Sequence, residues 1–311
     1  MKLKVLKFGG GVVYDASSIK LFVKRVSEEL KPNTNLVIVL SAFGKTTNNL
    51  EDLTKAFFKH SNDEDISGRL QRIKNFHINI AEGLFPNNDM YKKHAREEVF
   101  KTMIQIEEIG WTYRDHFSYD LLYDQIVSSG EKLSSFFCSL LLKRCRLRNE
   151  LVDACELIIT DSNFRNAKVN MNETTHHLTE KLCGFFQEKR VDIATTQGFI
   201  GSCYGNLYRF KTTLGREGSD YSAAIFATAL SAKEVILYKN VPGIMDKDPN
   251  VPGGEDAKLI ENLTYKRCEE LLHGTAKGII FPEAVNLLKS AKIPLRIKSF
   301  ENPGLPGTLI S

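Results

Sequence analysis

Apolar residues in this chain form short runs that predict strands, separated by longer stretches with helical spacing. Residues 2–8 alternate charged and apolar positions, and residues 36–40 form a continuous apolar run rich in β-branched side chains. Alternation is typical of a strand, and a continuous run is typical of a strand covered on both faces of a parallel sheet. Further strands are predicted at 157–161, 191–201, 233–238 and 295–299.

Helices are predicted between these strands. From about Asp15 to Leu30 the apolar residues recur on one helical face, and similar patterns occur at 128–141, 219–230, 264–273 and 282–291. Residues 52–118 are charged and helical in period, which indicates a helical insertion that forms either a lid or a dimer surface. Strand–helix alternation along the rest of the chain favours an α/β fold with a mainly parallel sheet.

The composition, 42% hydrophobic and 26% charged, is that of a soluble globular protein. A net charge of +4 with both signs interspersed argues against nucleic acid or a membrane surface as partner. No apolar run approaches the roughly 20 residues that span a bilayer, and charge interrupts the N-terminal apolar residues, so no signal peptide is expected. Six cysteines without zinc-site spacing are typical of reduced core residues, which predicts a cytoplasmic protein. The pair His176–His177 has no third ligand in register and is interpreted as a solvated helix face.

Residues 212–224, Thr-Thr-Leu-Gly-Arg-Glu-Gly-Ser-Asp-Tyr-Ser-Ala-Ala, form the most distinctive stretch. The two glycines predict a loop, and Ser219 or Asp220 is a suitable N-cap for the apolar helix that follows. Free N–H groups and the positive end of a helix dipole bind anions, and the planar fork of Arg216 suits a carboxylate or phosphate. An ordinary loop before a well-capped helix is the alternative interpretation.

Three other segments carry candidate chemistry. The first predicted strand ends in Gly9-Gly10-Gly11, with Lys7 placed to reach an anion held by the turn. The second strand runs into Ser41-Ala42-Phe43-Gly44-Lys45-Thr46-Thr47-Asn48, and ligands of α/β sheets bind at the carboxyl ends of strands. Glu131 lies in the first turn of a helix, where a simple favourable interaction with the dipole is the alternative role. The glycine turn, which matches neither a Walker A nor a Gly-x-Gly-x-x-Gly pattern, could equally reflect tight packing.

Six motifs, in order and over almost the whole chain, resemble the signatures of aspartokinases within the amino acid kinase fold. They are Lys7-Phe8-Gly9-Gly10, residues 41–48, Gly130-Glu131-x-x-Ser134, residues 196–201, residues 212–224 and residues 306–310. The resemblance implies a three-layer αβα sandwich around a mainly parallel central sheet. It also implies a single domain, 1–311, with a substrate lobe at about 1–190 that contains the insertion 52–118 and a nucleotide lobe at about 191–311.

The function implied by the resemblance is phosphorylation of the β-carboxylate of L-aspartate, with ATP and Mg²⁺, to 4-phospho-L-aspartate. This is the first step of lysine, threonine and methionine synthesis. A homodimer is expected, as is a catalytic domain without the ACT regulatory modules that usually follow in aspartokinases. The implied catalytic residues are Lys7 and Asp220, and the implied substrate-binding residues are Ser41, Thr47, Glu131, Arg216 and Ser219. The implied nucleotide-binding residues are Gly9, Gly10, Tyr238, Lys239, Asn240, Gly243, Asp248 and Pro249, and no set of protein metal ligands is predicted.

The implied chemistry suits these residue types. An aspartate side chain, with a reference pKa of about 3.9, is already ionised at neutral pH, so the nucleophile needs no general base. The site must position the reactants in line and offset the repulsion between two anions.

Several positions depart from the family pattern: Gly11-Val12 where Thr-Ser is customary, Lys239-Asn240 for Thr-Asp, Glu217 for Gly, Asn250 for Arg and Phe281 for His. The departures leave Lys7, Glu131, Arg216 and Asp220 intact, which favours an active enzyme. A catalytically weak or inactive relative that binds nucleotide or amino acid is the alternative hypothesis.

Overall fold

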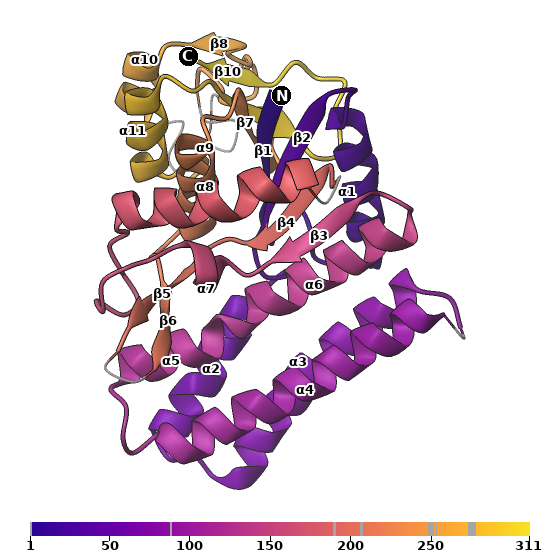
Figure 1. The fold of residues 1–311 in the computed structure, drawn as a ribbon, viewed down its shortest axis with the longest axis vertical. Helices are drawn as coiled ribbons and strands as arrows, with labels where there is room; N and C mark the ends of the chain where they lie inside the picture. Colours follow the sequence, from indigo (N-terminus) through magenta and orange to yellow (C-terminus); the bar gives the residue numbers. More distant parts are fainter. Residues whose placement is uncertain are drawn as a thin grey trace.

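A computed structural model describes residues 2–87, 89–188, 191–205, 208–247, 252, 254–272 and 278–311. Their main feature is an eight-stranded sheet in the order β3-β4-β2-β1-β7-β9-β10-β8, with helices on both faces (Figure 1). The strands are β1 Lys2–Phe8, β2 Thr34–Leu40, β3 Asn149–Val152, β4 Ile193–Gln197, β7 Glu234–Lys239, β8 Asn262–Leu263, β9 Leu295–Ser299 and β10 Thr308–Ile310. Each neighbouring pair is parallel except β9–β10, so the predicted α/β class and mainly parallel sheet are confirmed.

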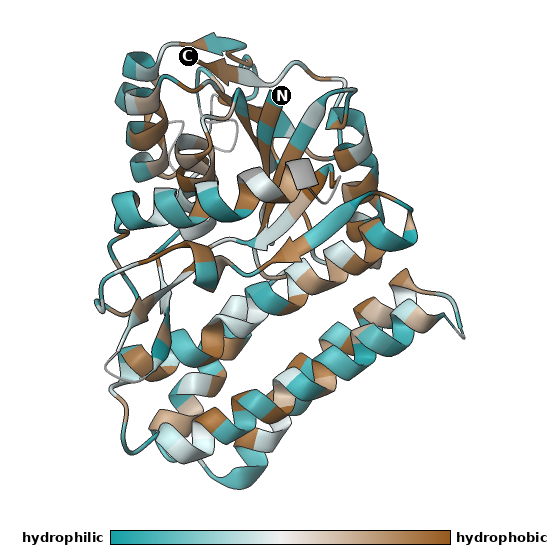
Figure 2. Cartoon of the chain, viewed as in Figure 1, coloured by the Kyte–Doolittle hydropathy of each residue, from teal (hydrophilic) through white to brown (hydrophobic). Residues whose placement is uncertain are grey.

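Side chains of β1 and β2 point alternately into two hydrophobic layers, one on each face of the sheet. Leu6 and Phe8 of β1 pack with α1 (Ala16–Glu29) and α6 (Ser129–Arg144) on one face. Val5 of β1 and Val37 of β2 pack on the other face with α8 (Met171–Glu188), α9 (Gly218–Ala229) and α11 (Pro282–Ala291). Successive residues of a strand point to opposite faces, so a strand buried on both faces needs the continuous apolar run seen at 36–40. The expected three-layer sandwich is confirmed, and Figure 2 shows brown strands between helices whose outer faces are teal.

The helical excursion contains α2 Thr46–Phe58, α3 Asp63–Leu84 and α4 Met90–Tyr113, followed by α5 Tyr119–Val127. The helices α3 and α4 lie side by side, with α4 against α6 and α3 against α1, so they form an outer layer over the helices on that face of the sheet (Figure 1). Side chains cap three of these four helices: Asn62, Asp89 and Ser118 accept hydrogen bonds from the amides of Asp65, Tyr91 and Leu121. The excursion begins at Thr46, earlier than predicted, because the 41–48 segment turns directly into α2.

Two predicted strands are wrong in part. Within 157–161 the chain instead ends the short helix α7 (Ala154–Leu157), and Ile159 and Thr160 make only isolated bridges. The predicted strand 191–201 is broken at Phe199, whose φ is 68°, into β4 and β5 (Ile200–Tyr204). Strand β5 pairs with β6 (Arg209–Thr213) in a separate two-stranded sheet. The break occurs where Gly198 passes so close to α9 that a Cβ atom there would lie 2.6 Å from the Cβ of Ser219.

The remaining helix, α10 (Tyr265–Leu271), lies beside α11. The helices α10 and α11 agree with the predicted 264–273 and 282–291 to within two residues. Among the described residues, no helix is both long and apolar enough to cross a bilayer.

Gly110 allows α4 to lie directly on α2. A Cβ atom at Gly110 would lie 2.5 Å from the ring of Phe57, which is fully buried. We therefore expect Gly110→Ala to lower the free energy of unfolding by about 1–3 kcal/mol, as overpacking does. Gly68→Ala in α3 is the matched control, because its new methyl group would meet only Arg72 at 3.7 Å and should stabilise the helix by up to about 1 kcal/mol. Urea unfolding measures both changes, and equal effects would contradict the packing explanation.

Candidate functional site

Two adjoining cavities lie at the carboxyl ends of the central strands. The glycine-turn cavity, about 230 Å³, is lined by Lys7, Gly9, Gly10, Gly11, Val12, Ser41, Glu217, Ser219, Asp220, Tyr238, Lys239 and Asn240. The Arg216 cavity, about 500 Å³, is lined by Ser41, Thr47, Asn48, Glu51, Tyr123, Glu131, Arg165, Phe199, Gly215, Arg216, Glu217, Gly218 and Ser219. Ser41, Glu217 and Ser219 line both, so groups bound in the two cavities would meet at this shared wall.

The turn after β1 is held against the segment after β2. The amides of Val12 and Val13 both donate to the carbonyl of Gly9, at 3.0 and 3.1 Å, and the amide of Ser41 donates to the carbonyl of Phe8 at 3.0 Å. A Cβ atom at Gly10 would lie 2.6 Å from the carbonyl oxygen of Ala42, so only glycine permits this approach. Among the described hydrogen bonds, none uses the amides of Gly10 and Gly11, which leaves two donors beside the cavity for an anion.

A buried cluster of Lys7, Asp220 and Lys239 forms the charged centre of the glycine-turn cavity. Asp220 Oδ1 lies 2.7 Å from Lys7 Nζ, and Asp220 Oδ2 lies 2.8 Å from Lys239 Nζ. Burial raises the pKa of Asp220, but the two ammonium groups outweigh it and hold that pKa below its usual value. Burial also lowers the pKa of Lys7, and Lys239 lowers it further. With two cations around one anion the cluster carries a net positive charge, which favours an anionic ligand.

Helix α9 presents its N-terminus to this cluster. The helix begins at Gly218, and the N-cap is Glu217, with φ 56° and no side-chain hydrogen bond. The prediction that Ser219 or Asp220 caps the helix is wrong, because the glycine-containing loop enters the helix through the left-handed Glu217 backbone. Ser219 and Asp220 therefore lie inside the first turn, where their side chains line the cavity instead of capping.

Glu131 projects from the first turn of α6 into the Arg216 cavity. Its Oε1 accepts a hydrogen bond from the amide of Ala42 at 3.2 Å, and its Oε2 is buried without a hydrogen-bond partner. Burial raises the pKa of Glu131 to about 8, against opposing effects of the Ala42 amide and Lys7. A buried oxygen left open at a cavity wall is suited to a ligand cation such as an ammonium group. The dipole interaction alone does not account for this placement.

Arg216 is exposed at the same cavity and makes no hydrogen bond or ion pair with the described residues. Its five N–H donors are therefore available to a ligand carboxylate. The five residues predicted to bind substrate, Ser41, Thr47, Glu131, Arg216 and Ser219, all line this one cavity.

Only some of the residues predicted to bind nucleotide line the glycine-turn cavity. Gly9, Gly10, Lys239 and Asn240 line the glycine-turn cavity. Tyr238 borders it as well, but its ring stacks on Phe8 at 4.8 Å and its hydroxyl lies 3.4 Å from Glu29 Oε1, so the side chain belongs to the core. Gly243 lines neither cavity and packs against Leu259 and Thr308. Asp248 and Pro249 lie outside the described residues, as does Asn250.

Two further departures from the family pattern, Gly11-Val12 and Phe281, lie within the described residues. Gly11 and Val12 line the glycine-turn cavity, so the site has glycine and an alkyl group where hydroxyl groups were expected. Phe281 packs edge-on against Tyr221, with ring centroids 6.2 Å apart, in the layer that covers α9.

Four residues that line the Arg216 cavity were not predicted from the sequence as site residues: Glu51, Tyr123, Arg165 and Phe199. Glu51 and Tyr123 come from the helical excursion and from α5, so the excursion contributes to the site. Arg165 has φ 66°, a left-handed backbone that no local sequence pattern predicts for arginine.

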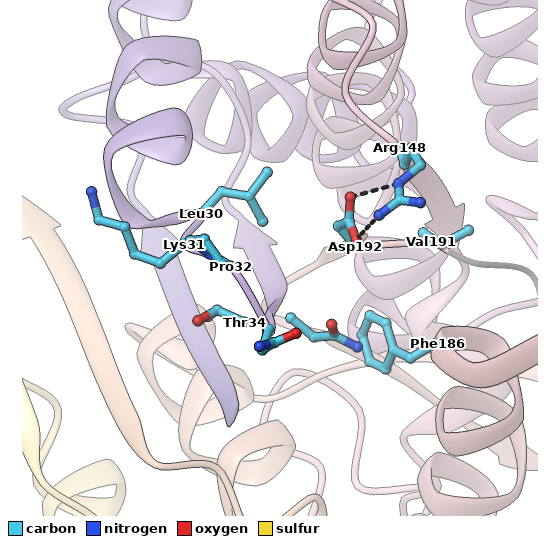
Figure 3. A pocket seen from close by; sticks show the side chains of 10 residues that line it. Leu30, Lys31, Pro32, Thr34, Arg148, Phe186, Val191 and Asp192 are labelled. Atoms are coloured by element: carbon cyan, nitrogen blue, oxygen red, sulfur yellow. Dashed lines mark hydrogen bonds and ion pairs between the residues drawn. The ribbon is translucent and has the colours of Figure 1, made fainter. Parts of the chain in front are cut away.

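A larger cavity, about 950 Å³, lies at the opposite edge of the sheet (Figure 3). Leu30 to Asn35 precede or begin β2, Arg148 precedes β3, and Asp192 precedes β4, so this cavity is at the amino ends of the strands. Its arginine is already paired, with Arg148 Nη2 and Nε at 2.6 and 2.8 Å from the two oxygens of Asp192. Ligands of open α/β sheets bind at the carboxyl ends, so size alone does not make this the functional site.

The structure is thus an α/β sandwich with two adjoining cavities at the carboxyl ends of its strands, one beside a glycine turn and one beside Arg216. The amino acid kinase family model matches residues 2–299, and the chain belongs to this family. The family assignment agrees with the motifs recognised in the sequence.

The similar proteins include aspartokinases. The chain is 30% identical to aspartokinase 3, chloroplastic, of Arabidopsis thaliana, and 29% identical to lysine-sensitive aspartokinase 3 of Escherichia coli, with 99% of this chain aligned in each case. It spans 52% and 64% of those proteins, between about half and two thirds of their length. The structure of E. coli aspartokinase III in complex with aspartate and ADP has a TM-score of 0.86 at 28% identity, covering 99% of this chain and 64% of that one. A uridylate kinase from Archaeoglobus fulgidus, at 17% identity and a TM-score of 0.51, shares the fold alone.

The Lys7–Asp220–Lys239 cluster leads to a stability prediction. Asp220→Asn keeps the shape but removes the carboxylate that pairs with both the buried Lys7 and the partly buried Lys239, so we expect a loss of about 3 kcal/mol in the free energy of unfolding. Adding Lys239→Met removes one of the two cations and should recover more than half of that loss. Urea unfolding of both variants checks this, and a double variant no more stable than Asp220→Asn would contradict the charge argument.

Proposed function

We propose that the protein phosphorylates the β-carboxylate of L-aspartate with ATP, to give 4-phospho-L-aspartate and ADP. The observation that carries the proposal is the pair of joined cavities: one offers lysines and free amides to phosphate, and the other offers an open carboxylate and a free guanidinium to an amino acid. The similarity to aspartokinases, including one solved with aspartate and ADP, supports this choice of substrates.

Aspartate carries three charged groups that match the Arg216 cavity. Its α-ammonium fits the open Oε2 of Glu131, and its α-carboxylate fits the unpaired guanidinium of Arg216. The hydroxyls of Ser41, Thr47 and Ser219 supply further hydrogen bonds. With both α-groups held, the β-carboxylate is directed to the wall shared with the glycine-turn cavity. Removing either ligand group would leave a cavity charge unpaired, which gives the site its selectivity.

Phosphoryl transfer between these two anions depends on positioning and charge. The β-carboxylate is ionised at neutral pH and attacks without a general base. Lys7 and Lys239, the amides of Gly10 and Gly11 and the positive end of α9 stabilise the charge on the transferring group. Lys7 is therefore the catalytic residue, and Asp220 acts through the two lysines as a positioning residue. The backbone of Tyr238 and the following residues to Pro249 complete the nucleotide site in this proposal.

The donor set at the shared wall fits a Mg²⁺ ion bound with the nucleotide. Both oxygens of Asp220 lie within ion-pair distance of lysines, whereas the carboxylate of Glu217 makes no hydrogen bond or ion pair with the described residues and lines both cavities. Mg²⁺ commonly takes one or two carboxylates and completes its shell with phosphate oxygens and water. Glu217 would supply the carboxylate, with the hydroxyl of Ser219 beside it, and the ion would offset phosphate charge.

The cellular setting is also proposed. The product would enter lysine, threonine and methionine synthesis, and the protein would be a cytoplasmic homodimer that uses neither nucleic acid nor a membrane as partner. The Arabidopsis relative is chloroplastic by name, so location differs within the group. Light scattering of the purified protein checks the dimer, for which a mass of about 35 kDa, that of a monomer, is the contrary result.

Turnover is the direct test of the proposal. Purified protein with ATP, Mg²⁺ and L-aspartate should form ADP together with an acyl phosphate that hydroxylamine traps as a hydroxamate. Lys7→Met should lower kcat by about 10²-fold or more, because it removes a charge that stabilises the transition state. Calorimetric binding of L-aspartate to the same variant serves as the control and should be preserved. Nucleotide binding without ADP formation would instead support the alternative of an inactive relative.

The raised pKa of Glu131 predicts a pH-dependent KM. Below about pH 8 the empty cavity holds a protonated Glu131, which must lose its proton to pair with an ammonium group. The KM for L-aspartate should therefore fall as pH rises from about 6 to 7.5, approaching tenfold per unit. Glu131→Gln should raise KM and remove this slope. An unchanged slope in the variant would exclude Glu131 as the titrating group.

A further inference from the structure

Three non-glycine residues with left-handed backbone line the Arg216 cavity. Among the described residues that line it, Arg165, Phe199 and Glu217 have φ values of 66°, 68° and 56°, and none of them is glycine. This conformation is uncommon and unfavourable for side chains other than glycine, asparagine and aspartate, and it persists where the surrounding structure imposes it, often at functional sites. Phe199 lies at the break between β4 and β5, and Glu217 is the N-cap of α9. Arg165 lies in a separate loop, after α7.

The backbone of Arg165 is held from two sides. Asp124, fully buried in α5, accepts hydrogen bonds from the amide of Arg165 at 3.0 Å and from the amide of Thr213 at 2.9 Å. A Cβ atom at Gly215 would lie 2.6 Å from Asn166 Oδ1, so the loop containing Arg165 packs directly on the residue before Arg216. The unfavourable conformation is thus imposed by contacts that also position the anion-binding loop.

The side chain of Arg165 reaches two acidic residues from two helices. Its Nη1 lies 3.3 Å from Asp120 Oδ1, and its Nη2 lies 3.6 Å from Glu51 Oε1, a separation that permits ion pairing but is long for a hydrogen bond. The guanidinium carbon lies 4.5 Å from the ring centre of Tyr123. Stacking on a ring fixes the plane of the guanidinium while its N–H edges remain able to donate.

Arg165 affects the balance between the acidic and basic side chains that line the Arg216 cavity. Glu51 and Glu217 are acidic, and Arg216 and Arg165 are basic. Two of them also have partners outside the lining: Lys55 lies 3.3 Å from Glu51, and Asp120 lies 3.3 Å from Arg165. Without Arg165, a single guanidinium would face two carboxylates before any ligand entered. A dicarboxylic amino acid carries one net negative charge, so such a cavity would repel it.

We propose that Arg165 is a specificity-determining residue of the Arg216 cavity, whose guanidinium offsets Glu51 and supplies the second positive charge that admits a dicarboxylic amino acid. The proposal rests on the proposed function and adds a residue to its substrate selection. It differs from a purely mechanical role, in which Arg165 would only tie its loop to α2 and α5.

The test compares Arg165→Gln, Arg165→Lys, Glu51→Gln and the double variant Arg165→Gln/Glu51→Gln. Calorimetry without nucleotide gives Kd for L-aspartate and L-asparagine, and the coupled assay gives kcat and KM. Arg165→Gln should raise Kd and KM for L-aspartate at least tenfold with kcat within about twofold, and should reduce the preference for L-aspartate over L-asparagine at least fivefold. Arg165→Lys should retain most of the affinity, and adding Glu51→Gln to Arg165→Gln should restore at least threefold.

Arg146→Gln is the matched control, because Arg146 also has left-handed backbone, at φ 61°, but it is exposed, follows α6 and lines neither cavity. It should leave every constant unchanged, and thermal melting confirms that each variant is folded. Unchanged affinity in Arg165→Gln overturns the inference while the proposed function stands. A loss that Glu51→Gln does not restore and that Arg165→Lys shares assigns Arg165 the mechanical role and also overturns it. A wild-type protein that does not bind L-aspartate at all would overturn the function and the inference together.

Discussion

The ion-pair cluster of Lys7, Asp220 and Lys239 is the interaction on which the site depends. It joins the end of β1, the first turn of α9 and the end of β7, three elements brought together only by the parallel sheet. Three charges taken out of water are costly unless each is paired, and Asp220 meets this condition by pairing with both lysines at once. The arrangement leaves a surplus positive charge at a cavity that also offers free backbone amides. The same contacts therefore maintain local structure and leave positive charge at the cavity wall.

The second constraint is the close approach of backbone segments around that cluster. Gly10 contacts the segment after β2, and Gly198 contacts the first turn of α9, each at a distance that a Cβ atom would prevent. These contacts place the glycine turn, Ser41 and Ser219 on one shared wall, so the two cavities adjoin instead of lying on separate faces. Glu131 then enters from α6 with one oxygen lacking a hydrogen-bond partner, and burial raises its pKa to about 8.

The helical excursion takes part in the site as well as covering the sheet. Glu51 and Tyr123 line the Arg216 cavity, and the guanidinium of Arg165 links them to the loop beside Arg216. The charged residues that line this cavity consequently come from α2, α6 and two loops. Proteins of one family can share the sheet and glycine turns yet differ in such distributed positions, which is where substrate selection is expected to vary.

Local patterns along the chain are enough to predict the strands β1, β2, β7 and β9 and the helices α1, α6, α9, α10 and α11 to within a few residues. They also identify the motif residues from Lys7 to Asp220. Periodicity and glycine placement are local properties, so they can be read along the chain. Contacts between distant segments determine three features that local patterns do not predict. Tyr238 turns its ring into the core, Glu217 takes the N-cap position of α9 in place of Ser219, and residues 157–161 do not form a strand. Such contacts also bring Arg165 to the cavity, because its position depends on Asp124 and Gly215, which are distant in sequence. Contacts between distant segments override local preference wherever a buried charge or a close backbone approach must be satisfied.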